Sequence, residues 1–163
     1  MTFKITTNNE IFGKRIILSV GINTYESVEI PKLSGAENDA KEIFDLLAVN
    51  GGFEKDYRYL ITGEAATYKN IMTFISQIFR EDREYDLGLF YFSGHGFMDK
   101  NNELYLATFD VNEKDPIVCG IKIKELKDII YSSKNKKNTV LILDCCYSGA
   151  ATEVLREIKF LRI

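Results

Sequence analysis

Residues 86–96 read Asp-Leu-Gly-Leu-Phe-Tyr-Phe-Ser-Gly-His-Gly, an apolar run that passes directly into a glycine-flanked histidine. Short continuous apolar runs of this kind are typical of strands buried on both faces of a parallel sheet. Residues 139–143 form a second such run, Thr-Val-Leu-Ile-Leu, and Asp-Cys-Cys-Tyr-Ser-Gly follows it at 144–149. We therefore expect buried strands over 86–92 and 139–143, each followed by a turn that carries reactive side chains.

The rest of the sequence alternates between short strand-like runs and longer segments with helical spacing. This alternation is the pattern of an α/β fold, a mostly parallel sheet with helices on its faces. Further strands are expected at 15–20, 57–61 and 103–108, and helices at 36–49, 67–79 and 123–131. The last segment, 150–163, is expected to be a helix or a tail. The length of 163 residues indicates one domain over 1–163.

The composition excludes several classes of protein. With 21 basic and 24 acidic residues the net charge is −3, so no polybasic surface for nucleic acid or membrane is indicated. The apolar runs are too short to span a bilayer, and the first ten residues lack the features of a secretory signal. Three cysteines, two of them adjacent, do not make a disulfide framework. A reduced, cytoplasmic protein is therefore expected, and a single histidine excludes a histidine-rich metal site.

His95 and Cys146 are the candidate reactive pair, because each follows an apolar strand. In open α/β sheets, functional groups gather where the strands end. A thiolate could attack a carbonyl while imidazole handles the proton, with the backbone N–H groups of Gly96 and Cys146 as oxyanion donors. Taken singly, each has an ordinary alternative: a polar surface histidine and a small buried cysteine. Their pairing at an interval of 51 residues favours the catalytic interpretation.

These motifs resemble those of the caspase-like cysteine peptidases, and their metacaspase and prokaryotic branch (peptidase C14) more than the animal caspases. The resemblance rests on Tyr-Phe-Ser-Gly-His-Gly at 91–96 and Leu-Asp-Cys-Cys-Tyr-Ser-Gly at 143–149. Gly-Ile-Asn-Thr-Tyr at 21–25 and Leu-Ser-Gly-Ala-Glu-Asn-Asp-Ala at 33–40 are similar to the N-terminal motifs of that branch. The likeness covers about residues 13–150 in the right order. It implies a caspase-like three-layer sandwich and the large, p20-like subunit.

Carried over residue by residue, the resemblance makes Cys146 the nucleophile and His95 its base. Cys145 takes the variable position of the motif, and strand alternation allows only one of the two cysteines to face His95. Asp39 and Asp144 match the two acidic residues of the specificity pocket, which implies cleavage after Arg or Lys. The alternatives are that Asp39 caps or solvates the first helix and that Asp144 bonds turn amides.

The sequence also departs from the family pattern. Tyr147 stands where metacaspases commonly have a second histidine, and the animal-caspase form Gln-Ala-Cys-x-Gly is absent, so cleavage after aspartate is not expected. Little chain follows Cys146, and 151–163 is interpreted as a tail or the start of an inter-subunit linker. The small-subunit part is therefore expected to be missing, the strand before Cys146 to have an unpaired edge, and a second chain or small-subunit segment to pair there.

The leading functional prediction is a cysteine endopeptidase that acts on protein or peptide substrates. The resemblance implies regulated proteolysis in defence, stress or cell death. No cofactor is expected, and although similar enzymes are commonly activated by calcium, no calcium site can be selected here. The competing interpretation is a non-catalytic caspase-like interaction module or incomplete pseudoprotease that needs a partner. A flavodoxin-like ligand-binding domain would fit the α/β pattern but leaves the paired motifs unexplained.

Overall fold

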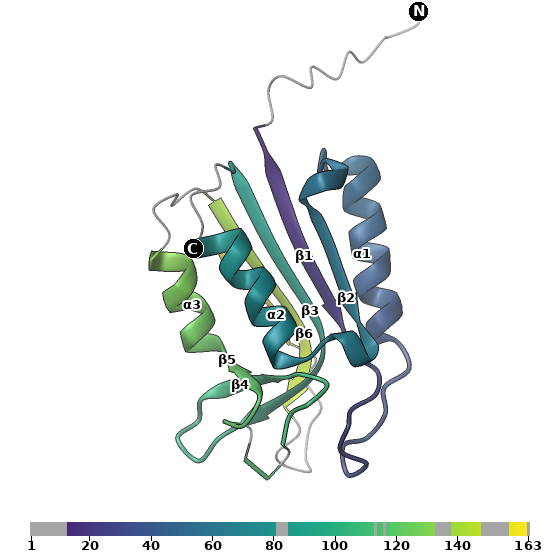
Figure 1. Cartoon of the computed structure of the whole chain (residues 1–163), viewed down its shortest axis with the longest axis vertical. Coiled ribbons are helices and arrows are strands. Elements are labelled where there is room, and N and C mark those ends of the chain that lie inside the picture. Colours follow the sequence, from purple (N-terminus) through teal and green to yellow (C-terminus); the bar gives the residue numbers. More distant parts are fainter. Residues whose placement is uncertain are drawn as a thin grey trace, which may run out of the picture.

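The computed structural model describes residues 13–80, 85–112, 114–115, 117–132, 138–147 and 157–162. Within them, one mixed sheet of seven strands forms the centre of the molecule, with helices on both sides (Figure 1). The strands are β1 (Arg15–Gly21), β2 (Arg58–Thr62), β3 (Leu87–Met98), β4 (Leu104–Ala107), β5 (Gly120–Lys122), β6 (Asn138–Tyr147) and β7 (Glu157–Arg162). The α-helices are α1 (Ala36–Asn50), α2 (Tyr68–Ile75), which continues into a π-helical turn at Ser76–Arg80, and α3 (Ile123–Ser132). Two short 3-10 helices lie at Lys55–Tyr57 and Gly63–Ala65.

The four central strands run parallel in the order β2-β1-β3-β6, and β3 is the longest. β1 accompanies β3 as far as Ser93, and β4 pairs antiparallel with the end of β3 from Gly96 onward. β6 accompanies β3 from Leu87 to Gly96. Because β4 and β6 both pair with Gly96, β4 must continue the β3 edge that β1 occupies. The end of β3 is therefore enclosed on both edges.

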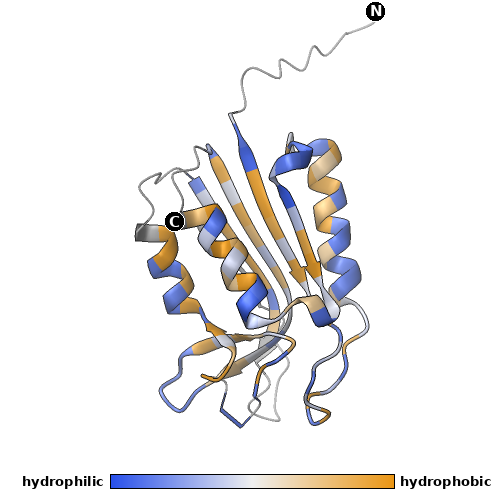
Figure 2. Cartoon of the chain, viewed as in Figure 1, coloured by the Kyte–Doolittle hydropathy of each residue, from blue (hydrophilic) through white to orange (hydrophobic). Residues whose placement is uncertain are grey.

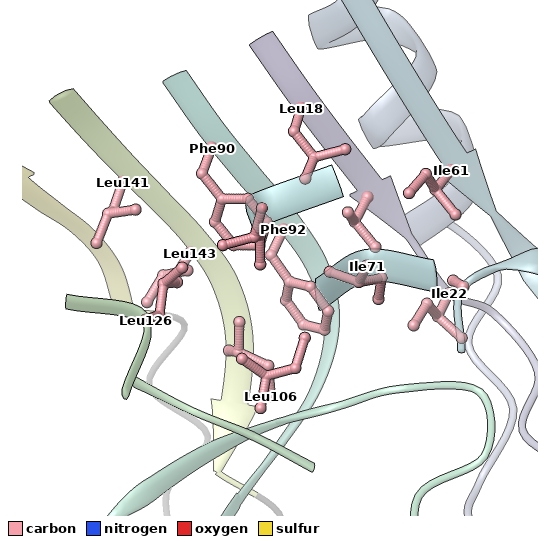
Figure 3. Close-up of a cluster of buried hydrophobic side chains, with 14 of the residues drawn as sticks. Leu18, Ile22, Ile61, Ile71, Phe90, Phe92, Leu106, Leu126, Leu141 and Leu143 are labelled. Atoms are coloured by element: carbon pink, nitrogen blue, oxygen red, sulfur yellow. The ribbon is translucent and has the colours of Figure 1, made fainter. Parts of the chain in front are cut away.

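Two apolar clusters hold helices on opposite faces of the sheet. α1 covers the smaller cluster, which includes Ile17, Ala40, Leu89 and Tyr91. α2 and α3 cover the larger one, whose side chains from β1, β3 and β6 pack against both helices (Figure 3). Apolar residues run along the strands, while the helices alternate apolar and hydrophilic positions (Figure 2). This arrangement is a three-layer sandwich, so the predicted fold class is confirmed.

β3 and β6 extend further than predicted. The apolar patterns place their ends at 92 and 143, before the serine, glycine and cysteine residues. The two strands instead remain paired through Gly96 and Tyr147. The cause is long-range hydrogen bonding, which local propensity does not report. The histidine and cysteine motifs therefore lie in strand ends and not in the turns that the pattern predicts.

The prediction of an unpaired edge beside β6 is wrong. β7 lies antiparallel on that edge, with Cys145 opposite Glu157 and Val140 opposite Arg162. The segment predicted as a helix or tail is thus partly a strand, while residues 148–156 and 163 lie outside the described part of the chain. A second chain that joins this side of the sheet would meet β7.

None of the described helices has both the length and the apolar character needed to span a bilayer.

Replacement of Phe90 by alanine tests the larger core. Phe90 is fully buried between β1 and β6, so Phe90→Ala should lower the free energy of unfolding by about 3–5 kcal/mol through lost burial and a residual cavity. Chemical denaturation measures this change. Val28, which is 93% exposed, provides the control, and Val28→Ala should alter stability by less than about 0.5 kcal/mol. Equal effects of the two substitutions would contradict the described core.

Candidate active site

The parallel pairing of β3 with β6 brings the two sequence motifs together. Leu87 pairs with Asn138, and the register continues without interruption to His95 beside Cys146 and Gly96 beside Tyr147. The interval of 51 residues between the histidine and the cysteine is therefore the register offset of the two strands. Neighbouring strands lie about 4.8 Å apart, so the two backbones are adjacent at this position. The structure describes the backbone of Cys146 and not its side chain.

Strand alternation assigns the neighbouring residues to faces. Leu89 and Tyr91 belong to the cluster under α1, and the same alternation carries Ser93 and His95 to the α1 face. On β6, Leu143 and Cys145 belong to the opposite, larger cluster. Cys145 is only 6% exposed. Of the two cysteines, Cys145 is thus a core residue on the face away from His95.

A small pocket lies beside His95 on the α1 face. Its volume is about 150 Å³, and it is lined by residues 33–36, Asp39, Ser93–His95 and Asp144. The pocket brings together three of the predicted site residues, from α1, β3 and β6. Asp39 and Asp144 are both half-buried there. Ser93 was not among the predicted site residues, although its place two positions before His95 is a period-two signal for the same face.

A larger pocket, of about 460 Å³, lies between the loops at residues 26–29 and 110–118. Its lining residues include Glu26, Glu29, Asp110 and Lys114, but neither a histidine nor a cysteine. Size alone does not make it the reactive site. The smaller pocket contains the imidazole and lies at the strand register that Cys146 shares.

The imidazole of His95 is oriented by a backbone carbonyl. Nε2 of His95 lies 2.8 Å from the carbonyl oxygen of Pro31. A carbonyl can only accept a hydrogen bond, so Nε2 carries a proton in this contact, and in the neutral imidazole Nδ1 is then the nitrogen that can accept one. The backbone N–H of His95 donates to the hydroxyl of Tyr25, also at 2.8 Å. Sequence patterns gave no signal for the Pro31 contact, because any residue could supply that carbonyl.

Residues 22–35 connect β1 to α1 and contain both Tyr25 and Pro31. Reciprocal hydrogen bonds fix this loop to the start of α1: the Asn23 N–H donates to Glu37 Oε1 at 3.2 Å, and the Glu37 N–H donates to Asn23 Oδ1 at 3.4 Å. The Leu33 N–H closes the loop on the Asn23 carbonyl at 2.8 Å. The two N-terminal motifs noted in the sequence therefore hold the loop that contacts His95.

Two tyrosines under the site are kept protonated. Burial raises the pKa of Tyr91 to about 12, and the charges of Asp144 and Asp39 act in the same direction, whereas a hydrogen bond with Ser93 acts in the opposite direction. Burial also raises the pKa of Tyr25, despite its hydrogen bond from the His95 backbone. A neutral phenol therefore lies close to His95, that of Tyr25, and another lies close to the pocket carboxylates, that of Tyr91.

The sequence matches the family model for the metacaspase, peptidase C14 domain over residues 14–155. The chain belongs to the metacaspase family. The predicted resemblance is thereby confirmed, and the family is one of cysteine peptidases.

Fungal metacaspases are among the similar proteins. The chain is 28% identical to metacaspase-1 of Debaryomyces hansenii over 94% of its own length, and 24% identical to metacaspase-1 of Botryotinia fuckeliana over 87%. It spans 36% of the length of each relative. The crystal structure of a Geobacter sulfurreducens protein shares the fold, with a TM-score of 0.67 at 21% identity, over 84% of this chain and 52% of that protein.

Calcium and other metals find no evident ligand cluster in the part of the chain that the structure describes. No group of three or more His, Cys, Asp or Glu side chains is arranged there to hold a metal ion.

Cys119, the third cysteine, is partly exposed. Burial raises the pKa of its thiol, and Asp110 adds to that effect.

Alkaline pH should destabilise this metacaspase domain through Tyr25 and Tyr91. The folded protein holds these phenolic protons more tightly than the unfolded chain, whose tyrosines titrate near about pH 10. The stabilisation is therefore complete below about pH 10 and is lost as the pH rises toward 12. Urea denaturation at a series of pH values over this range should show a falling free energy of unfolding. Tyr91→Phe should make the dependence of this free energy on pH less steep. An unchanged slope in Tyr91→Phe would contradict the raised pKa of Tyr91.

Proposed function

We propose that this chain is the catalytic domain of a cysteine endopeptidase that cuts proteins after Arg or Lys. In this proposal Cys146 is the nucleophile and His95 is its base. The observation that carries it is the strand register, which pairs the only histidine of the chain with Cys146. The buried position of Cys145, on the other face of the sheet, supports the choice between the two cysteines.

The hydrogen bond to Pro31 supports His95 as the base. Because Nε2 holds its proton on that carbonyl, Nδ1 is left to accept the proton of the Cys146 thiol. The thiolate then attacks the carbonyl carbon of the scissile peptide. The resulting oxyanion would be stabilised by the backbone N–H groups of Gly96 and Cys146. Gly96 is the next residue after His95 and is paired with Leu106 of β4 and Tyr147 of β6, so its N–H would act as a donor once the end of this pairing opens to substrate.

The second half of the reaction uses the same groups. The protonated imidazole gives its proton to the leaving amine, the peptide C–N bond breaks, and a thioester remains on Cys146. Water, deprotonated by His95, then attacks the thioester carbonyl. Collapse of that intermediate releases the carboxylate product and restores the thiol, so protons and bonds balance over the cycle.

The pocket beside His95 supports specificity for a basic residue. Two carboxylates, Asp39 and Asp144, share a pocket of about 150 Å³ with the buried Ser93. A guanidinium can pair with carboxylates through two hydrogen bonds, and an ammonium can pair as a point charge. A substrate carboxylate would meet like charge there, which argues against cleavage after aspartate.

Substitution of the adjacent cysteines tests the nucleophile. Cys146→Ala should reduce turnover of a fluorogenic peptide ending in Arg by at least about 10³-fold, because no thiolate remains to attack. Cys145→Ala is the matched control and should retain turnover. An arginyl chloromethyl ketone followed by mass spectrometry locates the reactive thiol even where turnover is slow. Alkylation of Cys145 or Cys119 in place of Cys146, in assays with and without calcium, would refute the assignment.

Neutralising the pocket tests the specificity. Asp39→Asn and Asp144→Asn should each lower kcat/KM for Arg peptides by about tenfold to a hundredfold, since a hydrogen bond to a charged group contributes roughly 1.5–3 kcal/mol. Asp45→Asn, at an exposed position of the same helix as Asp39, is the control and should leave kcat/KM unchanged. Faster cleavage after Asp than after Arg by the unsubstituted protein would overturn the proposed specificity.

A further inference from the structure

We propose that Tyr25 is a positioning residue for His95, which it holds through the backbone while Pro31 of the same loop holds the ring. This inference rests on the proposed function, because it assigns a role within the same site. The Tyr25 hydroxyl accepts a hydrogen bond from the His95 N–H at 2.8 Å and lies 3.4 Å from the Ile22 carbonyl, to which it donates. Only 8% of Tyr25 is exposed.

The hydroxyl occupies a gap in the strand pairing. Along one edge of β3, the ladder with β1 ends at Ser93, whose carbonyl accepts from the Ile22 N–H at 3.1 Å. The ladder with β4 begins at Gly96. The N–H of His95 falls between these two ladders, and the phenol of Tyr25 supplies its acceptor. On this edge of β3, the backbone N–H of the proposed base is therefore held by one side-chain hydroxyl.

Gly94 leaves the space that the hydroxyl needs. A Cβ atom at position 94 would lie 3.1 Å from the Tyr25 oxygen and 3.0 Å from Cζ of Phe92. Both distances are shorter than ordinary van der Waals contact, so a side chain there would press on the phenol. Packing against Tyr25 and Phe92 therefore accounts for the first glycine of the Ser-Gly-His-Gly motif.

Tyr25 also contacts the imidazole itself. The two ring centroids lie 5.3 Å apart at an interplanar angle of 41°. The ring of His95 is thus bounded by the Tyr25 ring and by the Pro31 carbonyl, and both come from the loop at residues 22–35. That loop is tied to α1 through Asn23 and Glu37, and the Glu26 N–H donates to the Phe109 carbonyl at 2.9 Å. A displacement of His95 would therefore have to break contacts at two points of an anchored loop.

Tyr25→Phe tests this role, because it retains the ring and removes only the hydroxyl. The expected result is a fall in kcat of about tenfold with KM nearly unchanged, since the base is displaced while the pocket carboxylates remain. Tyr59→Phe is the matched control: the Tyr59 hydroxyl also donates to a backbone carbonyl, that of Asp56, but away from the site. Tyr59→Phe should leave kcat unchanged.

A spectroscopic measurement separates positioning from general destabilisation. The chain has one histidine, so the ring nitrogens of His95 give the only imidazole signals in a ¹⁵N spectrum. In a buffer in which imidazole is neutral, the unsubstituted protein should show the Nε2–H tautomer that the Pro31 contact requires. Tyr25→Phe should shift this population toward a mixture of tautomers, and Tyr59→Phe should not.

The outcomes distinguish the two proposals. An unchanged tautomer and unchanged kcat in folded Tyr25→Phe would overturn the positioning role and leave the proposed peptidase function intact. Absence of turnover in the unsubstituted protein would count against the peptidase function, while the ¹⁵N measurement would still decide the role of Tyr25.

If thermal unfolding shows that Tyr25→Phe does not fold, Gly94→Ala is the second variant, because its Cβ should displace the same hydroxyl. An unchanged tautomer in folded Gly94→Ala would then refute the proposal.

Discussion

The parallel ladder between β3 and β6 is the interaction on which the remaining features depend. It joins two segments that are 51 residues apart and continues past the apolar part of each strand. Because side chains alternate along a strand, this single register decides which residues enter the core and which line the pocket. A slip of β6 by one residue relative to β3 would place Asp144 on the face of the sheet opposite to His95. Helices on both faces bury the two sides of this ladder.

Much of the fold could be predicted from the sequence, because the central strands are continuous apolar runs and the helices have clear spacing. The errors lie where tertiary pairing overrides local pattern. β3 was expected to end at Phe92, since serine and glycine follow, yet pairing with β4 and β6 carries it to Met98. The residues of β5 are too few to give a periodic signal. β7 depends on β6 for its hydrogen bonds, and its own sequence does not determine a strand.

The candidate site divides in the same way. His95, Cys146, Asp39 and Asp144 carry distinctive side chains, so motif and resemblance could select them, although their chemical roles remain proposals. The structure adds that Asp39, Asp144 and His95 border one pocket and that Cys145 belongs to the core. Pro31 could not have been selected, because its contribution is a backbone carbonyl. Tyr25 is part of a motif that the resemblance noted, but only the three-dimensional arrangement connects its hydroxyl to His95.

The burial of Cys145 has a consequence for oxidation chemistry. A disulfide requires its two Cβ atoms within about 4.5 Å of each other and a suitable torsion about the sulfurs. Consecutive residues of an extended strand direct their Cβ atoms to opposite faces. The strand is held by ladders on both edges at Cys145 and by the ladder with β3 at Cys146. A bond between these neighbours would require the end of β6 to leave the sheet. As long as the sheet is intact, the two neighbouring thiols would therefore react with an oxidant separately and not with each other. Cys145 is in addition shielded by the core.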